Sequence, residues 1–418
     1  MLRIKKMFAA VPASILVFFI TCSNTVVEES LNGHWEGEMI CNGRSLEIRF
    51  NISRDRFHYD IPGLGFYGQP VNSFDITGKN FTFTISGKEQ LTVKGSIKNN
   101  ELTAVVEDIE EVSLKMKRTS KDPVFFTEEE LSYVSDDAII SGTLIKPNGP
   151  RPFPIIVFVH GSGKMTRETM RSRAYMFVEN GSAAFIFDRR GKGKSAGDTS
   201  RILPISIMAG DVINAVKFLK DNSGIDNSKI GLYGLSQGGW VAPYAASICE
   251  DIDFIITISA PGITPDEQNT YVVNNIVQKQ IKKVYKTSEW GKYLNPEEMN
   301  SLDSINYDNF RSEYGETEVV KGFSWFNPIP VWQKINIPVL AIWGGADDIV
   351  PPVVSMNCIK NALINNANCT YKIFEGANHT IKLPEEKDKF AGKWEIVAPG
   401  SDEFVLDWFK NKILTDKK

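Results

Sequence analysis

Between residues 31 and 118, apolar and polar positions alternate in short runs that are separated by Gly, Asn and Lys. Three of these runs carry apolar residues at every second position: Leu46, Ile48 and Phe50; Phe81, Phe83 and Ile85; Val112, Leu114 and Met116. A period of two is typical of strands with one buried face, because successive side chains of a strand point to opposite sides. The pattern predicts a small antiparallel β domain over about residues 30–120.

The pattern changes after residues 119–123. A hairpin-like stretch over residues 131–145 is followed by continuous apolar runs, with segments compatible with helices between them: Ile155–Val159, Ala183–Phe187, Ile230–Tyr233, Phe254–Ile258 and Val339–Trp343. Runs that are apolar at every position suit parallel strands covered on both faces. Between two of these runs, apolar residues at i, i+3, i+4 and i+7 mark one face of a helix: Val212, Ala215, Val216 and Leu219. Residues 125–418 are therefore predicted to form an α/β domain with a mostly parallel sheet and helices on both faces.

The alternation is interrupted between about residues 263 and 335. This segment is rich in aromatic and charged residues, among them Tyr271, Trp290 and Trp332, and it has no strand pattern. Insertions of this length without a strand pattern commonly cover a functional site. We expect a helical cap over the α/β domain.

Residues 1–22 have the pattern of a secretion signal. Basic residues precede an apolar run over residues 7–20, which is shorter than the roughly 20 residues of a membrane helix. The run ends in Phe19-Ile20-Thr21-Cys22, which resembles a bacterial lipoprotein signal, in which the cysteine is lipidated after cleavage. We expect export to the periplasm or cell envelope, with plain secretion as the alternative to a lipid on Cys22. No other membrane contact is expected.

Composition narrows the classes of function. The formal net charge is −4, and the N-terminal signal holds basic residues and no acid, so the rest of the chain is more acidic still. Such a chain has no basic excess to attract nucleic acid. With four histidines in all, a histidine-rich metal site is nearly excluded. Of the cysteines, Cys358 and Cys369 are close enough in sequence to suggest a disulfide, and buried free thiols are the alternative.

The strongest chemical signal follows the apolar run Ile230–Tyr233. Gly234-Leu235-Ser236-Gln237-Gly238 matches G-x-S-x-G and precedes a segment compatible with a helix, in which Pro243 predicts a kink or a late helix start. At a strand-to-helix turn of this kind the serine hydroxyl is exposed, and glycines are needed where neighbouring main chain crowds the turn. We expect Ser236 to be a nucleophile.

A serine hydroxyl needs a base at neutral pH, and in this arrangement serine, acid and histidine follow one another along the chain. Three of the four histidines precede Ser236. The remaining one, His379, lies in a loop after the predicted strand Tyr371–Phe374, where it could reach back across the carboxyl edge of the sheet. We expect His379 to be the base.

The acid that orients His379 is expected in the loop after Val339–Trp343, where two adjacent carboxylates compete. Gly-x-x-Asp with a proline four residues later is the recurrent arrangement, and it selects Asp347. Its neighbour Asp348 is then expected to cap the loop or the next helix.

The oxyanion of an acyl-transfer intermediate needs main-chain N–H donors. We expect one from Gln237, directly after the nucleophile, and one from Ser162 in the loop His160-Gly161-Ser162-Gly163. His160 is expected to hold this loop. The remaining histidines, His34 and His58, are expected to pack on the surface or strands of the β domain.

A third loop, over residues 188–195, is rich in glycine and lysine. It lacks the spacing of a P-loop and of G-x-G-x-x-G. We expect a tight turn at the sheet edge rather than a phosphate site.

Residues from about 130 to 415 resemble the α/β-hydrolase superfamily. Gly234–Trp240, His160–Gly163 and Ser259–Gly262 are similar to segments of bacterial serine esterases that carry an N-terminal β domain. The resemblance implies acyl transfer to Ser236 and hydrolysis of the acyl-enzyme by water, with no metal or organic cofactor. Carboxylesterases, thioesterases, proline-type aminopeptidases and acyltransferases share this fold, so the substrate does not follow from it.

We therefore expect an exported serine hydrolase of the carboxylesterase type that acts on a small-molecule acyl ester, with short to medium or aromatic acyl groups favoured by the aromatic cap. The alternatives are an aminopeptidase or thioesterase of the same fold, or a surface binding protein with a dispensable hydrolase domain. An aminopeptidase would need acidic cap residues to meet a substrate ammonium, and the candidates are Glu267, Glu289 and Glu313.

Overall fold

The computed structural model describes residues 31–41, 43–85, 91–107, 109–149, 152–163, 165–197, 204–222, 224–272, 274–275, 326–383 and 395–415. The predicted secretion signal with Cys22, and most of the predicted cap, lie outside these residues. Among the described residues, no helix is both long enough and apolar enough to cross a membrane.

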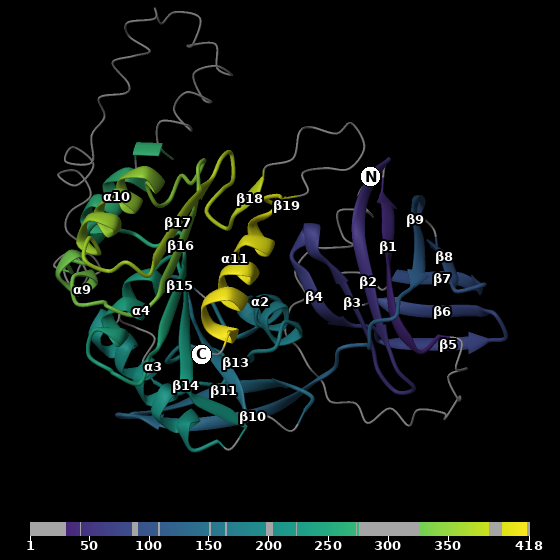
Figure 1. Ribbon diagram of the computed structural model, residues 1–418, viewed down its shortest axis with the longest axis horizontal. Helices are drawn as coiled ribbons and strands as arrows, with labels where there is room; N and C mark the ends of the chain where they lie inside the picture. Colours follow the sequence, from purple (N-terminus) through teal and green to yellow (C-terminus); the bar gives the residue numbers. More distant parts are fainter. Residues whose placement is uncertain are drawn as a thin grey trace, which may run out of the picture.

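The N-terminal part of the chain forms a nine-stranded antiparallel sheet in the order β4-β3-β2-β1-β9-β8-β7-β6-β5 (Figure 1). One side of it is buried: in β8, for example, positions alternate between exposed and buried along the whole strand. The predicted antiparallel β domain is confirmed. Its elements are β1 Gly33–Cys41, β2 Arg44–Ile52, β3 Phe57–Ile61, the short 3₁₀ helix η1 Pro62–Leu64, β4 Phe66–Pro70, β5 Ser73–Thr77, β6 Asn80–Ile85, β7 Leu91–Lys98, β8 Glu101–Val106 and β9 Ile109–Arg118.

The second part of the chain forms an eight-stranded sheet in the order β10-β11-β13-β12-β14-β15-β16-β17. β11 is antiparallel to both neighbours and the other pairs are parallel. The continuous apolar runs are its central strands, and every residue of β12, β13, β15 and β16 is buried. The strands are β10 Phe126–Ser135, β11 Ala138–Pro147, β12 Phe153–Val159, β13 Ala183–Phe187, β14 Ile225–Leu235, β15 Phe254–Ile258, β16 Val339–Gly344 and β17 Cys369–Phe374.

Helices cover both faces of this sheet, as the buried runs predict. The cores on the two faces contain α3, α4, α9 and α10 on one side and α2 and α11 on the other. The predicted helical stripe lies in α3 and is fully buried. The elements are α2 Glu168–Glu179, α3 Ile205–Lys220, α4 Gly238–Ala246, α9 Ile329–Trp332, α10 Pro352–Ala362, α11 Ser401–Phe409 and the π-helical η4 Lys410–Leu414, with a small ladder of β18 Lys382–Leu383 and β19 Ile396–Val397.

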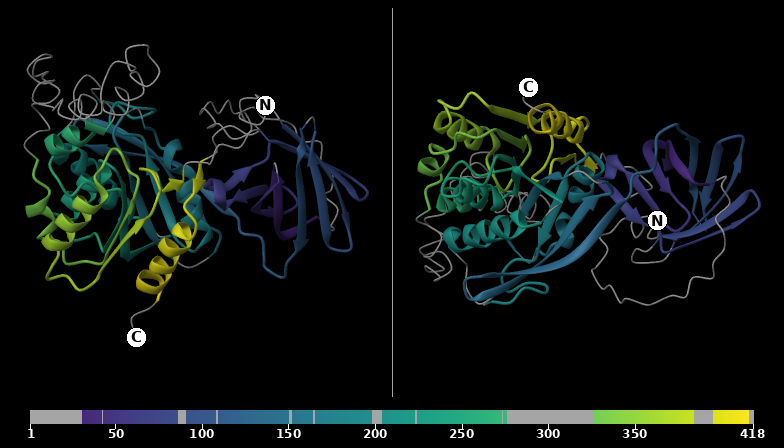
Figure 2. Two further views of the ribbon diagram at one scale, coloured as in Figure 1. Left: turned by 90° about the horizontal axis from the view of Figure 1, so that it is seen from above. Right: turned by 60° about the horizontal axis from the view of Figure 1, so that its bottom comes forward.

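The two parts pack side by side through β4 and α2 (Figures 1 and 2). The main-chain N–H of Tyr67 donates to Ser172 Oγ at 3.0 Å, and that hydroxyl donates to the carbonyl oxygen of Gly65 at 2.6 Å. The Tyr67 hydroxyl donates to Asp402 of α11 at 2.7 Å. The β domain is therefore attached through buried polar contacts in addition to apolar ones.

The structure answers two questions that the sequence left open, namely where the helix after Ser236 begins and whether Cys358 and Cys369 form a disulfide. The late helix start predicted from Pro243 is wrong, because α4 begins at Gly238 and contains the proline. Its C-terminal turn still closes, since the N–H of Ser247 donates to the carbonyl of Pro243 at 2.8 Å. No disulfide joins Cys358 and Cys369, so the alternative of free thiols holds for them.

Candidate active site

The predicted nucleophile, Ser236, lies in the turn between β14 and α4. Its φ of +53° is in the left-handed region, which costs a non-glycine residue roughly 1–2 kcal/mol. Gly238 must lack a side chain, because a Cβ there would overlap the carbonyl oxygen of Val159 on the neighbouring strand. The strained serine and the crowded glycine are the features that G-x-S-x-G predicts.

Ser236 is fixed by main-chain hydrogen bonds on both sides. Its N–H donates to the carbonyl of Ile258, at the end of β15, at 2.9 Å, and its carbonyl accepts from the N–H of Gly239 at 2.7 Å. These bonds leave the hydroxyl as the group that can react, at the carboxyl edge of the sheet.

The two predicted oxyanion donors flank this turn. A Cβ on Gly161 would lie 3.4 Å from the Cβ of Ser236, so the loop that carries Ser162 borders Ser236. Gln237 directly follows Ser236 and precedes the first turn of α4. Within the described part of the chain, neither the N–H of Gln237 nor that of Ser162 donates a hydrogen bond.

The predicted acid and base are in contact. Asp347 is buried, and its Oδ2 lies 2.7 Å from Nδ1 of His379. Its other oxygen, Oδ1, accepts from the N–H groups of Ile349 at 2.8 Å and Val350 at 2.9 Å, which holds the carboxylate in one orientation. Of the two neighbouring aspartates, Asp347 is therefore seen to contact the imidazole, as its place in Gly-x-x-Asp predicts.

Close main-chain packing brings these two loops together. A Cβ on Gly344 would overlap the carbonyl oxygen of Asn378, next to His379. The N–H of Ala346 donates to the carbonyl of Ala377 at 2.8 Å. The hydroxyl of Tyr271, in the segment after β15, donates to the main-chain carbonyl of Asp347 at 2.7 Å. The start of the predicted cap is therefore bound to the loop that contains Asp347.

Ser236 and His379 are at the same sheet edge, but no hydrogen bond joins their side chains in this structure. Catalytic hydrogen bonds are often long before a substrate is bound. The two residues are linked through Ser259, which follows β15 and has a φ of +51°. Its N–H donates to the carbonyl of Ile342 and its Oγ donates to the main-chain carbonyl of His379 at 2.9 Å.

Ser259 was not predicted from the sequence as a site residue and was used only as part of the resemblance of Ser259–Gly262 to bacterial serine esterases. Its position in the sequence could have indicated a role, because Ser259 directly follows a buried strand, at the sheet edge where the other candidate site residues lie. Its contact with the base loop depends on the sheet order and could not be read locally.

His160 does not have the properties of a base. It is fully buried, and burial together with the charge of Arg189 lowers its pKa to about 4. Its ring lies edge-on against Phe187, with centroids 4.9 Å apart. At neutral pH His160 is therefore an uncharged packing residue below the loop that carries Ser162.

The histidines of the β domain also pack. His34 is buried and its Nδ1 lies 2.8 Å from Asn51 Oδ1. His58 is stacked on Phe126, with ring centroids 5.0 Å apart, and burial lowers its pKa. Over the described ranges, no group of three or more His, Cys, Asp or Glu side chains is placed to hold a metal ion.

The stretch over residues 188–195 is a turn, as predicted. The N–H of Lys192 donates to the carbonyl of Arg189 at 2.8 Å, and the N–H of Ser195 donates to that of Lys192 at 2.9 Å. It follows β13 at the edge where the loop with Ser162 lies, because Arg189 contacts that loop.

Comparison with known proteins gives a family match over more than half of the chain. The model of the family described as "Serine aminopeptidase, S33" matches residues 150–387. An uncharacterized 31.7 kDa protein from the traX-finO intergenic region of Escherichia coli is 23% identical over 260 residues, which are 57% of this chain and 90% of that protein. Esterase EstD of Thermotoga maritima is 24% identical over 282 residues, 64% of this chain and 63% of EstD. Among solved structures, an esterase of Pyrococcus furiosus is similar, with a TM-score of 0.47 and 20% identity over 69% of this chain and 92% of that one.

The low pKa of His160 makes a testable contribution to acid sensitivity. In the unfolded chain its pKa is near 6.5, and in the folded chain it is about 4, so between these values the unfolded state binds more protons. Stability should therefore fall as the pH is lowered from about 6.5 to about 4. In His160→Gln this part of the fall is absent, so the drop in melting temperature between pH 7 and pH 5 should be smaller than in the wild type. Equal drops in the two proteins would show that His160 does not titrate in this way.

Proposed function

We propose that this chain, which belongs to the serine aminopeptidase (S33) family of α/β-hydrolases, is a serine hydrolase that cleaves carboxylic esters through a covalent acyl-enzyme. The observation that carries the proposal is the 2.7 Å contact of Asp347 Oδ2 with His379 Nδ1, at the sheet edge where the strained Ser236 lies. An ionised carboxylate only accepts hydrogen bonds, so Nδ1 carries the proton and Nε2 keeps its lone pair. That lone pair is what a serine nucleophile requires.

The proposed reaction has two halves. Ser236 Oγ attacks the acyl carbon while His379 Nε2 takes its proton, and the N–H groups of Gln237 and Ser162 stabilise the oxyanion. His379 then gives the proton to the leaving alcohol oxygen, and the ester C–O bond breaks. In the second half a water molecule, deprotonated by His379, attacks the acyl-enzyme, and the acid is released as Ser236 regains its proton.

Ester substrates are favoured over aminoacyl amides by one contact in the described start of the predicted cap. Glu267 Oε2 accepts from the N–H and the hydroxyl of Thr264, both at 2.8 Å, and the N–H of Glu267 points back to Thr264 Oγ. This is a capping box, so Glu267 is occupied in starting its helix. The other two candidates for binding a substrate ammonium, Glu289 and Glu313, lie outside the described residues. The family description names an aminopeptidase and EstD is named an esterase, so the relatives are compatible with either reaction.

We also propose that the protein is exported and anchored by a lipid on Cys22. The support is the sequence alone: a basic start, an apolar run over residues 7–20 and a cysteine directly behind it.

Removal of single triad members should stop the reaction. Ser236→Ala should abolish labelling by a fluorophosphonate probe, and His379→Ala should lower kcat at least about 1,000-fold, because members of a triad act as a unit. His58→Ala, which removes a histidine from the β domain, is the control and should leave kcat within about twofold. An adduct that persists in Ser236→Ala would rule out this serine as the nucleophile.

Substrate class can be decided with purified protein. We expect hydrolysis of p-nitrophenyl acetate and butyrate and no release of naphthylamine from aminoacyl-naphthylamides, with acetyl thioesters as a third series. Cleavage of the aminoacyl amides without cleavage of the esters would replace the esterase by an aminopeptidase, and the same triad would then serve that reaction.

The lipid anchor can be tested in a bacterial host fed with labelled palmitate. The full chain should incorporate label and sediment with membranes, whereas Cys22→Ser should be unlabelled and stay in the soluble fraction. The same distribution for both proteins would favour plain secretion.

A further inference from the structure

The turn after β13 presents one arginine to the predicted oxyanion loop. Nη1 of Arg189 donates to the carbonyl oxygen of Gly161 at 3.0 Å and lies 3.4 Å from that of Gly163. Nη2 lies 3.5 Å from Sδ of Met208. No carboxylate of the described chain forms an ion pair with Arg189, and burial lowers its pKa. A partly buried cation without a counter-ion is costly, so its presence needs another reason than ion pairing.

The first of these carbonyls belongs to a particular peptide unit. The C=O of Gly161 and the N–H of Ser162 are parts of the same peptide group, and no cis peptide bond is present among the described residues. In a trans peptide the C=O and N–H point in opposite directions. When Arg189 holds the carbonyl, the N–H of Ser162 must therefore point away from the guanidinium. The same peptide unit borders Ser236, because a Cβ on Gly161 would be 3.4 Å from the Cβ of Ser236.

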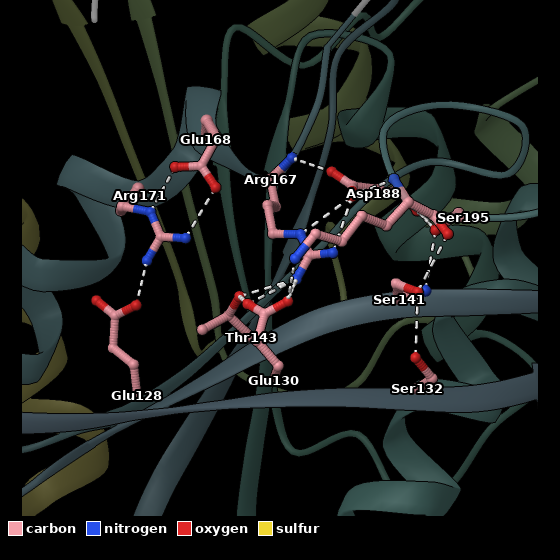
Figure 3. Close-up of polar contacts among 11 residues, drawn as sticks. Glu128, Glu130, Ser132, Ser141, Thr143, Arg167, Glu168, Arg171, Asp188 and Ser195 are labelled. Atoms are coloured by element: carbon pink, nitrogen blue, oxygen red, sulfur yellow. Dashed lines mark hydrogen bonds and ion pairs between the residues drawn. The ribbon is translucent and has the colours of Figure 1, made fainter. Parts of the chain in front are cut away.

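The residue before Arg189 is held firmly. The carboxylate of Asp188 accepts from the main-chain N–H of Arg167 at 2.9 Å, from its Nε at 3.0 Å and from the N–H of Lys194 at 2.9 Å. Figure 3 shows Arg167 reaching Asp188 and, on its other side, Glu130 and Thr143. The Ser195 hydroxyl donates to the carbonyl of Asp188 at 2.7 Å, which closes the turn.

The residue after Arg189 is held as well. Arg190 is buried, and its Nη2 donates to Asp211 Oδ1 at 2.6 Å and to the carbonyl of Ser135 at 2.9 Å. Arg190 also pairs with Asp137. Both neighbours of Arg189 are thus fixed to the α/β domain through other elements, so the turn determines the direction in which Arg189 extends.

We propose that Arg189 is a positioning residue for the oxyanion site: it holds the Gly161–Ser162 peptide so that the N–H of Ser162 faces the oxyanion formed on Ser236. Its positive charge also polarises that peptide and makes the N–H a stronger donor. This inference rests on the proposed function. Loss of an oxyanion donor costs about 100- to 1,000-fold in kcat. A donor that is present but no longer oriented should cost less, roughly 10- to 100-fold.

The test compares Arg189→Met with a matched control, Lys194→Met. Lys194 lies in the same turn, and its substitution by Met removes one positive charge, as does Arg189→Met. The side chain of Lys194 contacts the exposed carboxylate of Glu130 instead of the loop with Ser162. With p-nitrophenyl butyrate we expect kcat of Arg189→Met to fall roughly 10- to 100-fold with KM within about threefold, and the rate of fluorophosphonate labelling to fall in parallel. Lys194→Met should keep both rates within about twofold, and melting temperatures should show that each variant is folded.

A second variant separates orientation by the guanidinium from a merely structural effect. Arg189→Ala leaves room for a guanidinium ion, so guanidine hydrochloride at low millimolar concentration should restore part of kcat in this variant and have no effect on Lys194→Met. Absence of rescue together with an unchanged labelling rate in Arg189→Met would overturn the role of Arg189. A rise in KM for acidic acyl groups at constant kcat would overturn it in favour of substrate binding. Failure of the wild type to label would instead overturn the proposed function, and this inference with it.

Discussion

The candidate site depends on unusually close main-chain packing at the carboxyl edge of the eight-stranded sheet. Gly238 and Gly344 have no room for a Cβ, because carbonyl oxygens of Val159 and Asn378 occupy that space. A side chain at either position would move the loops apart. The turn that strains Ser236 and the loop that brings Asp347 to His379 both need this approach, so the chemistry follows from a steric condition of the backbone.

The strained residues directly follow two consecutive strands. Ser236 and Ser259, which follow β14 and β15, are both in the left-handed region. Each is bonded to the next strand of the sheet: the N–H of Ser236 to the carbonyl of Ile258 in β15, and the N–H of Ser259 to the carbonyl of Ile342 in β16. Because parallel strands end at one edge, each turn is anchored on its neighbour, and the unfavourable dihedral angles are outweighed by hydrogen bonds within a rigid sheet.

Helix α2 connects this edge with the β domain. Arg167, directly before the helix, binds Asp188 and so supports the turn that carries Arg189. One turn further along, Ser172 bonds the main chain of Tyr67 in the β domain, and Tyr67 bonds Asp402 of α11. These contacts make the β domain part of the packing around the hydrolase sheet rather than a freely attached module.

Patterns within a few residues were sufficient for much of the protein. The alternation in residues 31–118 and the apolar runs such as Ile155–Val159 predict the two sheets, because burial of one or both faces of a strand imposes its own period on the sequence. The G-x-S-x-G turn nominates Ser236 for the same reason: its steric requirement is local. His379 could be nominated as the base because it is the one histidine in the sequence that follows Ser236.

Contacts between segments far apart in the chain were decided by the tertiary structure. Asp347 contacts His379, Ser259 Oγ donates to the carbonyl of His379, and Arg189 holds the carbonyl of Gly161. The low pKa of His160 likewise comes from burial under elements that no local pattern specifies. The order and the parallel direction of the strands bring these loops to one edge, and strand order is a property of the whole sheet, whereas the pattern in any one strand records only whether its faces are buried.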